Sequence, residues 1–310
     1  MERSGGVRVS VVIPTYNRWE LLQQALESVR EQTYRDIEVI VVDDGSTDAT
    51  REVVAASPLK PIYLFQNNRG RGAARNLGVM RASGELVAFL DSDDLWHRDR
   101  LARHVAFLFK NPDAVFVHGP VDVIDEKGRR DEAESERMAR LYRKAARRGF
   151  GLESLLDSCL IFSSAVTVRR TLFEEVGLFD PTFRILEDLE WYLRVSQQYR
   201  ICFLEGPPVA SYRIHRGNAY RTGDRTVLET YRKIFSRYLD AGHPNSLSAA
   251  VRAQANLSLS FCYAGLGEGR RVRQHIRAAL ALRPRSVLRM DVVKRLARSM
   301  VSGVPQRGVP

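Results

Sequence analysis

Residues 85–96 read ELVAFLDSDDLW, an apolar run that ends in closely spaced carboxylates. The run 85–90 has the length and the near-continuous apolar character of a strand that is covered on both faces of a sheet. Asp91, Asp93 and Asp94 follow it directly. Crowded carboxylates repel one another, and the pKa of at least one rises unless a cation lies between them. The stretch therefore predicts a buried strand whose carboxyl end is either screened by solvent or joined by a cation.

Short β-rich runs and helical patterns alternate around this stretch. The other runs are residues 7–13, 37–42, 62–65 and 114–119. Apolar residues recur on one helical face in residues 21–29 and again in residues 101–109. Strand, helix and strand at this spacing predict right-handed crossovers and a mainly parallel sheet flanked by helices, which is an α/β fold. Ligands of such sheets bind beyond the carboxyl ends of the strands.

Polar turns follow three of the predicted strands. They are PTYN at 14–17, DDGSTD at 43–48 and DSDD at 91–94. Each turn alone has a structural explanation, because Ser46 or Thr47 can cap a helix, Gly45 can supply a turn, and the acids of DSDD can complement a helix N-terminus. Together they are expected to form one site, since the carboxyl ends of parallel strands meet at one edge.

These turns carry side chains suited to a nucleotide. The ring of Tyr16 offers a stacking face for a nucleobase, and the Asp44 carboxylate can accept hydrogen bonds from a base N–H or a ribose hydroxyl. Arg71 and Arg75, within NNRGRGAARNLG, can donate to phosphates or sugar. The segment is not a Walker loop, and no GxGxxG follows the first strand, so an NAD-type dinucleotide fold has little support.

The spacing of Asp91 and Asp93 suits a divalent metal. Magnesium and manganese prefer oxygen ligands and typically also bind a diphosphate. A cation at this turn would offset the mutual repulsion of the acids. The sequence therefore predicts manganese or magnesium as a cofactor.

Five segments in order resemble the successive motifs of glycosyltransferase family 2. They are SVVIPTYNR, IVVDDGSTDAT, NRGRGAARNLG, FLDSDD and LFDPTFRILEDLEWYLR, and the resemblance covers residues 7–216. It implies the nucleotide-sugar fold called GT-A, a Rossmann-like, mainly parallel mixed sheet flanked by helices. It also implies an inverting enzyme. The QxxRW of processive synthases is absent, since the nearest string is QQYRI at 197–201, so transfer of one sugar per encounter is expected.

The resemblance also assigns roles to individual residues. It implies donor binding by Pro14, Tyr16, Asp44, Arg71, Arg75, Asp91 and Ser92, metal binding by Asp91, Asp93 and His215, acceptor binding by Glu187 and Trp191, and a general base at Asp188. From the residues alone, Glu187 and Asp188 can equally be the acidic first turn of a helix. His215 can equally be an exposed loop histidine. The family motif favours a base, because displacement at an anomeric carbon needs one to remove the acceptor proton.

The expected reaction moves a sugar from a nucleoside diphosphate-sugar to a hydroxyl of a lipid-linked or soluble glycan acceptor, in cell-surface glycan or glycolipid synthesis. Two alternatives remain: a sugar-phosphate nucleotidyltransferase, and a nucleic-acid-binding protein that uses the basic tail. The second leaves DSDD and LEDLEW unexplained, so nucleic acid is not expected as a partner.

The chain is expected to divide into a catalytic GT-A domain at 1–223 and a basic helical region at 224–310. Residues 257–284 are similar to one tetratricopeptide hairpin. Residues 269–310 hold 11 of the chain's 48 Lys and Arg residues but only one of its 37 Asp and Glu residues. This excess indicates contact with nucleic acid, anionic lipid or an acidic partner, or else only a solvated helical face.

Location and cysteine chemistry complete the expectations. No apolar run approaches the roughly 18 residues of a membrane span, and the N-terminus lacks the features of a secretory signal. A cytoplasmic protein is expected, with peripheral contact at the inner face of the membrane as an option. Cys159, Cys202 and Cys262 lack CxxC spacing and are expected to be buried thiols.

Overall fold

A seven-stranded mixed sheet forms the centre of the larger part of the chain, in the order β3-β2-β1-β4-β8-β6-β9. The computed structural model describes residues 6–215, 224–239 and 247–284. Four of the six strand pairs are parallel, and β8 runs antiparallel to both neighbours. The strands are β1 (Val9–Thr15), β2 (Ile37–Asp43), β3 (Ile62–Phe65), β4 (Leu86–Phe89), β6 (Phe116–His118), β8 (Val166–Arg169) and β9 (Cys202–Phe203). The predicted mainly parallel mixed sheet is confirmed.

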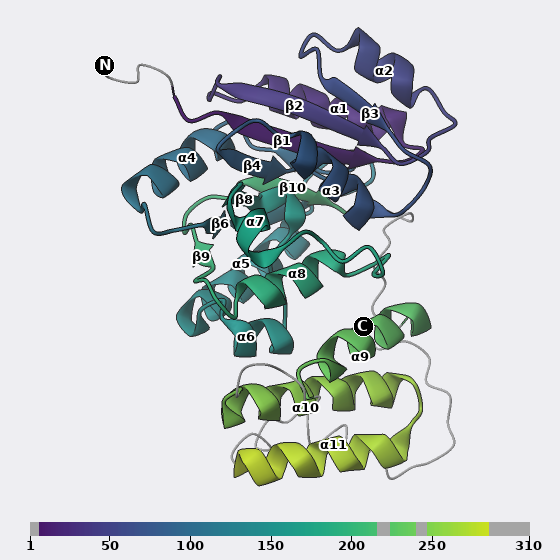
Figure 1. The fold of residues 1–310 in the computed structure, drawn as a ribbon, viewed down its shortest axis with the longest axis vertical. Coiled ribbons are helices and arrows are strands. Elements are labelled where there is room, and N and C mark those ends of the chain that lie inside the picture. The colour runs from purple at the N-terminus through teal and green to yellow at the C-terminus, as the bar shows by residue number, and fades with distance from the viewer. Residues whose placement is uncertain (1–5, 216–223, 240–246, 285–310) are drawn as a thin grey trace. The chain divides into compact units, whose positions relative to one another are not determined.

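Helices cover both faces of the central strands, which is why these strands are mostly apolar. Every residue of β1 and β4 is buried. The helices α1 (Trp19–Arg30) and α3 (Arg71–Arg81) lie on opposite faces of β1 and β2, and α2 (Thr50–Ala56) packs beside α1 (Figure 1). At Gly78 of α3 a Cβ would lie 2.4 Å from Val12 Cγ1, so the helix approaches the sheet more closely than a larger residue would allow.

The strand order reverses between β1 and β4. The chain steps outward from β1 to β2 and β3, and then returns to pair β4 with the other side of β1. Such a switch point leaves a crevice at the carboxyl ends of the strands where ligands of open α/β sheets bind. The turns that follow β1, β2 and β4 all lie at this edge, as predicted.

A second, three-stranded sheet continues from this edge, in the order β5-β10-β7. Its strands are β5 (Leu95–Trp96), β7 (Val121–Ile124) and β10 (Ala210–Arg213). Around the two sheets are α4 (Arg100–Lys110), α5 (Glu132–Arg148), the 3₁₀ turn η1 (Ser163–Ala165), α7 (Leu172–Val176) and α8 (Glu187–Val195). The small sheet brings the end of β10 to the segment Asp91–Asp94, although more than 100 residues separate them.

The remaining helices form a second compact unit. Contacts divide the chain into Met1–Gly151 with Leu160–Gly217, and Leu152–Cys159 with Asn218–Pro310. The second unit contains α6 (Leu152–Asp157), α9 (Arg225–Ser236), α10 (Ala249–Gly265) and α11 (Gly269–Leu282). Ser258 of α10 donates to the Leu156 carbonyl at 2.5 Å, which ties α6 to this unit. Sequence patterns did not show that a helix from within residues 1–223 packs here.

The hairpin of α10 and α11 buries one apolar face of α11. Val272, Ile276 and Ala279 are buried, and Leu280 is partly buried. Cys262, on α10, is buried, whereas Cys159 and Cys202 are only partly buried, so the expectation of buried thiols is confirmed for Cys262 alone.

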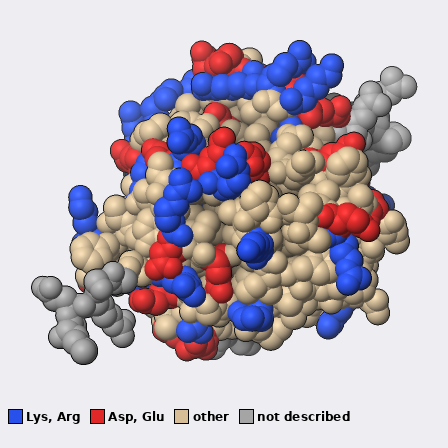
Figure 2. Space-filling model, turned by 90° about the horizontal axis from the view of Figure 1, so that it is seen from above, with Lys and Arg blue, Asp and Glu red and all other residues tan. Residues whose placement is uncertain are grey.

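Within the described residues, every helix is too short or too polar to span a bilayer. On the face shown in Figure 2, Lys and Arg side chains are interspersed with Asp and Glu. Part of the basic excess lies on α11, and the rest of it, in residues 285–310, lies outside the described residues.

Candidate active site at the carboxyl edge of the sheet

Three carboxylates gather where β4 ends. One oxygen each of Asp91, Asp93 and Asp94 lies within 4.8 Å of the others. Asp94 is only 3% exposed. Burial, followed by the negative charges of Asp93 and Asp91, raises the pKa of Asp94 well above its usual value. The alternative that these acids complement a helix N-terminus is not observed, because α4 begins only at Arg100.

Cationic side chains from other parts of the chain hold two of these acids. Arg75 Nη2 donates to Asp91 Oδ1 at 2.5 Å. Arg18 donates to Asp93 Oδ2, and His215 Nε2 lies 3.1 Å from the same oxygen. Burial alone would raise the pKa of Asp93, but the hydrogen bond with His215 and the charge of Arg18 outweigh it and lower this pKa to about 2. Asp93 is therefore held as a carboxylate.

Asp94 is held by polar groups instead of by a charged side chain. The hydroxyl of Ser164 donates to Asp94 Oδ2 at 2.6 Å, and the backbone N–H of Arg213 donates to Oδ1 at 2.9 Å. Nε of the Arg213 guanidinium donates to the Asp93 carbonyl oxygen at 2.7 Å. Asp94 therefore anchors the turn on β10.

The three carboxylates fit a divalent cation. Their oxygens are the ligand type that Mg²⁺ and Mn²⁺ prefer, and their mutual repulsion is what a bound cation offsets. Asp91 and Asp93 were predicted to bind the metal, and the structure adds Asp94 to the cluster. His215, the third predicted ligand, contacts Asp93 directly.

The turns after β1 and β2 are tied to each other. The Asn17 N–H donates to Ser46 Oγ at 2.9 Å, and the Thr47 N–H donates to Asn17 Oδ1 at 2.8 Å. Ser46 and Thr47 thus bind the neighbouring turn and do not cap α2. Gly45 adopts a φ of 92°, and a Cβ there would lie 3.0 Å from the backbone nitrogen of Asn68. Tyr16, on this joined pair of turns, is 44% exposed.

Pro14 and Asp44, predicted to bind donor, are both buried. Pro14 lies inside β1 opposite Val42 of β2, so its ring does not face a ligand. The Asp44 carboxylate accepts hydrogen bonds from the backbone N–H groups of Arg69 and Gly70, both at 2.8 Å, and from Gln66 at 2.6 Å. Asp44 therefore shapes the loop that leads into α3, and its contact with a base or ribose stays a prediction.

The two arginines of the Gly-rich segment behave differently. Arg75 is 1% exposed and lies between Asp91 and Glu187, so it positions these acids and cannot reach a donor in this conformation. The Arg71 side chain is 44% exposed, with Nε 3.6 Å from Glu187 Oε1. Of the two, Arg71 is the one placed to meet a phosphate or a sugar.

The predicted acceptor residues lie in the interior. Glu187 is 1% exposed, and burial raises its pKa despite the charges of Arg71 and Arg75. Trp191 has no exposed surface, and its ring stacks on that of Phe173 with 4.7 Å between the ring centroids. Its indole N–H donates to the Gly177 carbonyl. The structure does not support acceptor binding by Glu187 or Trp191, because both side chains are enclosed and already partnered.

Asp188 differs from these two neighbours. It is partly exposed at the start of α8, and Ser163 Oγ donates to its Oδ2 at 3.3 Å. Leu186 precedes the pair in a left-handed conformation with a φ of 60°, which is uncommon for a residue with a bulky side chain. Such backbone conformations cluster at functional sites. Asp188 keeps the exposure that a general base requires.

Sequence reasoning missed four residues of the site: Arg18, Ser163, Ser164 and Arg213. Arg18 stands in the segment SVVIPTYNR, two residues after Tyr16, so its place in that motif could have indicated it. The two serines lie in a turn without periodicity, and nothing in the sequence relates Arg213 to Asp94. Ser92 is 3% exposed, so its predicted contact with the donor would involve little side-chain surface.

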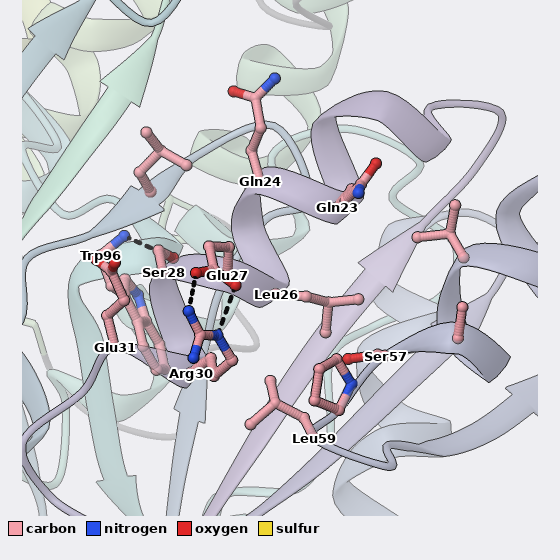
Figure 3. A pocket seen from close by; sticks show the side chains of 14 residues that line it. Gln23, Gln24, Leu26, Glu27, Ser28, Arg30, Glu31, Ser57, Leu59 and Trp96 are labelled. Atoms are coloured by element: carbon pink, nitrogen blue, oxygen red, sulfur yellow. Dashed lines mark hydrogen bonds and ion pairs between the residues drawn. The ribbon is translucent and has the colours of Figure 1, made fainter.

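A pocket of about 640 Å³ lies along α1, away from these residues. Figure 3 shows Leu26 of α1 and Leu59 lining it, with the Glu27–Arg30 ion pair on α1 and Trp96 of β5 nearby. No residue predicted to bind donor, metal or acceptor lines this pocket. The candidate site is therefore the open edge of the sheet and not this pocket.

Comparison with known proteins addresses the family directly. The family described as Glycosyl transferase family 2 matches residues 10–177. The chain belongs to glycosyltransferase family 2. An uncharacterized glycosyltransferase of Nostoc sp. is 35% identical over 230 residues, which are 72% of this chain and 70% of that protein. An uncharacterized glycosyltransferase of Rickettsia felis is 33% identical over 200 residues, covering 63% of this chain but only 31% of that longer protein.

Solved structures show the same fold. S. aureus TarS 1–349 in complex with UDP-GlcNAc has a TM-score of 0.66 at 21% identity, covering 94% of this chain and 88% of that one. The mannosyltransferase PcManGT from Pyrobaculum calidifontis, in complex with GDP-Man and Mn²⁺, has a TM-score of 0.59 at 22% identity, covering 96% of this chain and 87% of that one. The expected GT-A-like fold of a glycosyltransferase is thus confirmed.

Proposed function

We propose that this glycosyltransferase is metal-dependent and inverting, and moves one sugar from a nucleoside diphosphate-sugar to a hydroxyl of a lipid-linked or soluble glycan acceptor. The observation that carries the proposal is the cluster of Asp91, Asp93 and Asp94 at the switch point of the sheet, with exposed Tyr16 on the adjoining turn. The structural neighbours with UDP-GlcNAc and with GDP-Man and Mn²⁺ support a nucleotide-sugar donor and a divalent ion.

Donor binding is assigned to the residues that face outward. Tyr16 stacks on the nucleobase, and Arg71 donates to the diphosphate or the sugar. Asp91 and Asp93 hold the metal, with Arg75 and Arg18 fixing their carboxylates. A bound Mn²⁺ or Mg²⁺ supplies Lewis-acid stabilisation of the charge that develops on the diphosphate.

The transfer step is assigned to Asp188. Its carboxylate accepts the proton of the acceptor hydroxyl while the oxygen attacks the anomeric carbon. The bond from that carbon to the diphosphate oxygen breaks, and its electron pair leaves with the nucleoside diphosphate. Attack from the face opposite the leaving group inverts the anomeric configuration.

A thermal-shift screen of UDP- and GDP-sugars, with and without Mn²⁺, tests the donor and metal together. A saturating ligand at ~100 times its dissociation constant stabilises the folded protein by about 2.7 kcal/mol. The largest shift is expected only when sugar nucleotide and Mn²⁺ are both present, and Asp93→Ala should abolish the metal-dependent part. Equal shifts with and without Mn²⁺ in both proteins would overturn metal dependence.

Product analysis separates this reaction from sugar-phosphate nucleotidyl transfer. The proposed transfer releases nucleoside diphosphate, whereas a nucleotidyltransferase makes a nucleotide sugar and releases pyrophosphate. We assign the glycan product to cell-surface glycan or glycolipid synthesis. The basic helix α11 supports contact with anionic membrane where the acceptor is lipid-linked.

A further inference from the structure

We infer that the pair Ser163–Ser164 is the positioning element of the transfer reaction, with Ser164 fixing the acidic turn and Ser163 fixing Asp188. The inference rests on the proposed function, because it assigns the metal to the acidic turn and the base to Asp188. Both serines lie in η1, the 3₁₀ turn before β8, and both are nearly buried, at 4% and 1% exposed.

Ser164 joins two of the three clustered acids through one hydroxyl. Its Oγ donates to Asp94 Oδ2 at 2.6 Å and accepts from the Asp91 N–H at 3.0 Å. A hydroxyl has one proton and two lone pairs, so both bonds form at once. The bonds fix the first and last residues of the segment Asp91–Asp94, and therefore the spacing of its carboxylates.

The backbone of Ser164 is itself held from behind. Its carbonyl accepts from Trp96 Nε1 at 2.7 Å and from Arg100 Nε at 3.1 Å. Arg100 also donates to the Val166 carbonyl at 2.7 Å, and its guanidinium lies 3.9 Å from the centre of the Trp96 ring. The planar donor groups of Trp96 and Arg100 thus fix the Ser164 carbonyl, and with it the position of the Ser164 hydroxyl.

Ser163 contacts the proposed base, Asp188, and not the acidic turn. Its hydroxyl donates to Asp188 Oδ2 at 3.3 Å and lies 3.2 Å from the Tyr192 hydroxyl. Two consecutive residues of one short turn therefore contact the proposed base on one side and the acids on the other. This arrangement sets the distance from the base to the donor site, and a misplacement of about 1 Å in such a site can cost ~100-fold in rate.

The two serines are expected to have separable effects. Ser164→Ala removes the hydrogen bonds that orient Asp91 and Asp94, so Mn²⁺ affinity should fall about tenfold, as outer-shell changes do. Ser163→Ala leaves the acids in place, so Mn²⁺ and donor binding should stay unchanged while kcat falls. A purely structural role for the turn would not produce this division.

The test is a titration of the full chain with Mn²⁺, following free Mn²⁺ by electron paramagnetic resonance, with kcat and KM for the donor measured in parallel. Thr167→Val is the matched control, because it removes a buried hydroxyl three residues on that contacts Arg100 and His104 and no carboxylate. Ser164→Cys replaces the hydroxyl with a slightly larger thiol that is only a weak donor, and it serves if Ser164→Ala does not fold.

Unchanged Mn²⁺ affinity in the folded Ser164 variant, or an equal loss in Thr167→Val, overturns the role of Ser164. Unchanged kcat in Ser163→Ala overturns the role of Ser163. A native chain that binds no Mn²⁺ overturns the metal-dependent function and this inference with it, so the two failures are distinguishable.

Discussion

The two units differ in the burial of the ion pairs compared here: the first contains a buried pair, and the second contains surface pairs. In the first unit Arg75 and Glu187 are each 1% exposed and form a buried ion pair that also includes Asp91. In the second, the pairs Arg225–Glu229 and Arg271–Glu268 are surface pairs with side chains 38–77% exposed. Removal of one partner of a buried pair strongly destabilises the fold, whereas an exposed pair contributes little to stability. Charge therefore determines the site geometry in the first unit and is replaceable in the second.

Removing a buried cation should have the largest effect. Arg75→Met takes from Glu187 and Asp91 the buried cation that they share and leaves Glu187 only the longer contact with Arg71, so the free energy of unfolding should fall by about 3–5 kcal/mol. Urea denaturation followed by tryptophan fluorescence measures this, because all three tryptophans lie in the first unit. The control Arg225→Gln breaks an exposed pair and should cost less than about 1 kcal/mol by circular dichroism. Similar losses in both variants would remove the contrast between the units.

The proposed base should affect chemistry and leave folding intact. Asp188→Asn keeps the side-chain shape but cannot accept the proton, so transfer should fall by roughly 100-fold or more while the donor-induced thermal shift persists. Steady-state kinetics and the thermal-shift assay are the measurements. If donor binding and stability collapse along with activity, Asp188 is a structural residue of the first turn of α8.

Burial of a histidine should make the first unit sensitive to acid. His118 is fully buried among Phe116, Phe150 and Phe203, and burial lowers its pKa to about 3. The unfolded chain takes up this proton near pH 6.5 and the folded chain only near pH 3, so stability is lost as pH falls between these values, by about 1 kcal/mol per pH unit.

The variant His118→Phe should remove this part of the pH dependence, as measured by urea denaturation from pH 7 to pH 4. The comparison is His275 of the second unit, which is only partly buried, and whose pKa is lowered by burial and by Arg271. His275→Phe should change the slope less. An unaltered slope in His118→Phe would show that other groups dominate acid unfolding.

The smallest effect on folding is expected for the basic face of α11. Replacing Arg270, Arg273 and Arg277 with Gln should change the free energy of unfolding by no more than about 0.5 kcal/mol, as surface substitutions do. Turnover with a soluble acceptor should be retained. Sedimentation with phosphatidylserine vesicles should fall, because each basic residue contributes about 1 kcal/mol near an anionic surface. A native protein that does not sediment at physiological salt would remove the proposed membrane contact.

Sequence reasoning worked best where the signal was local. The runs 37–42 and 62–65 were placed within one residue of β2 and β3, because short runs rich in β-branched and aromatic residues indicate strands. The acidic turn at 91–94 was found because it follows such a run. Strands β8 and β10 and the helix α6 were not placed, because they are short and take their positions from partners elsewhere in the chain.

By itself the sequence determined the family, the order of the main strands and helices, and the edge of the sheet where polar turns collect. The family follows from the resemblance of five motifs, and the rest follows from periodicity and composition over a few neighbouring residues. Only the tertiary structure decided which acids and cations meet. Arg75 pairs with Glu187 across 112 residues, and the Arg213 N–H reaches Asp94 across 119. Such pairs depend on how distant elements pack, and burial then decides whether a charged side chain binds a ligand or positions a neighbour.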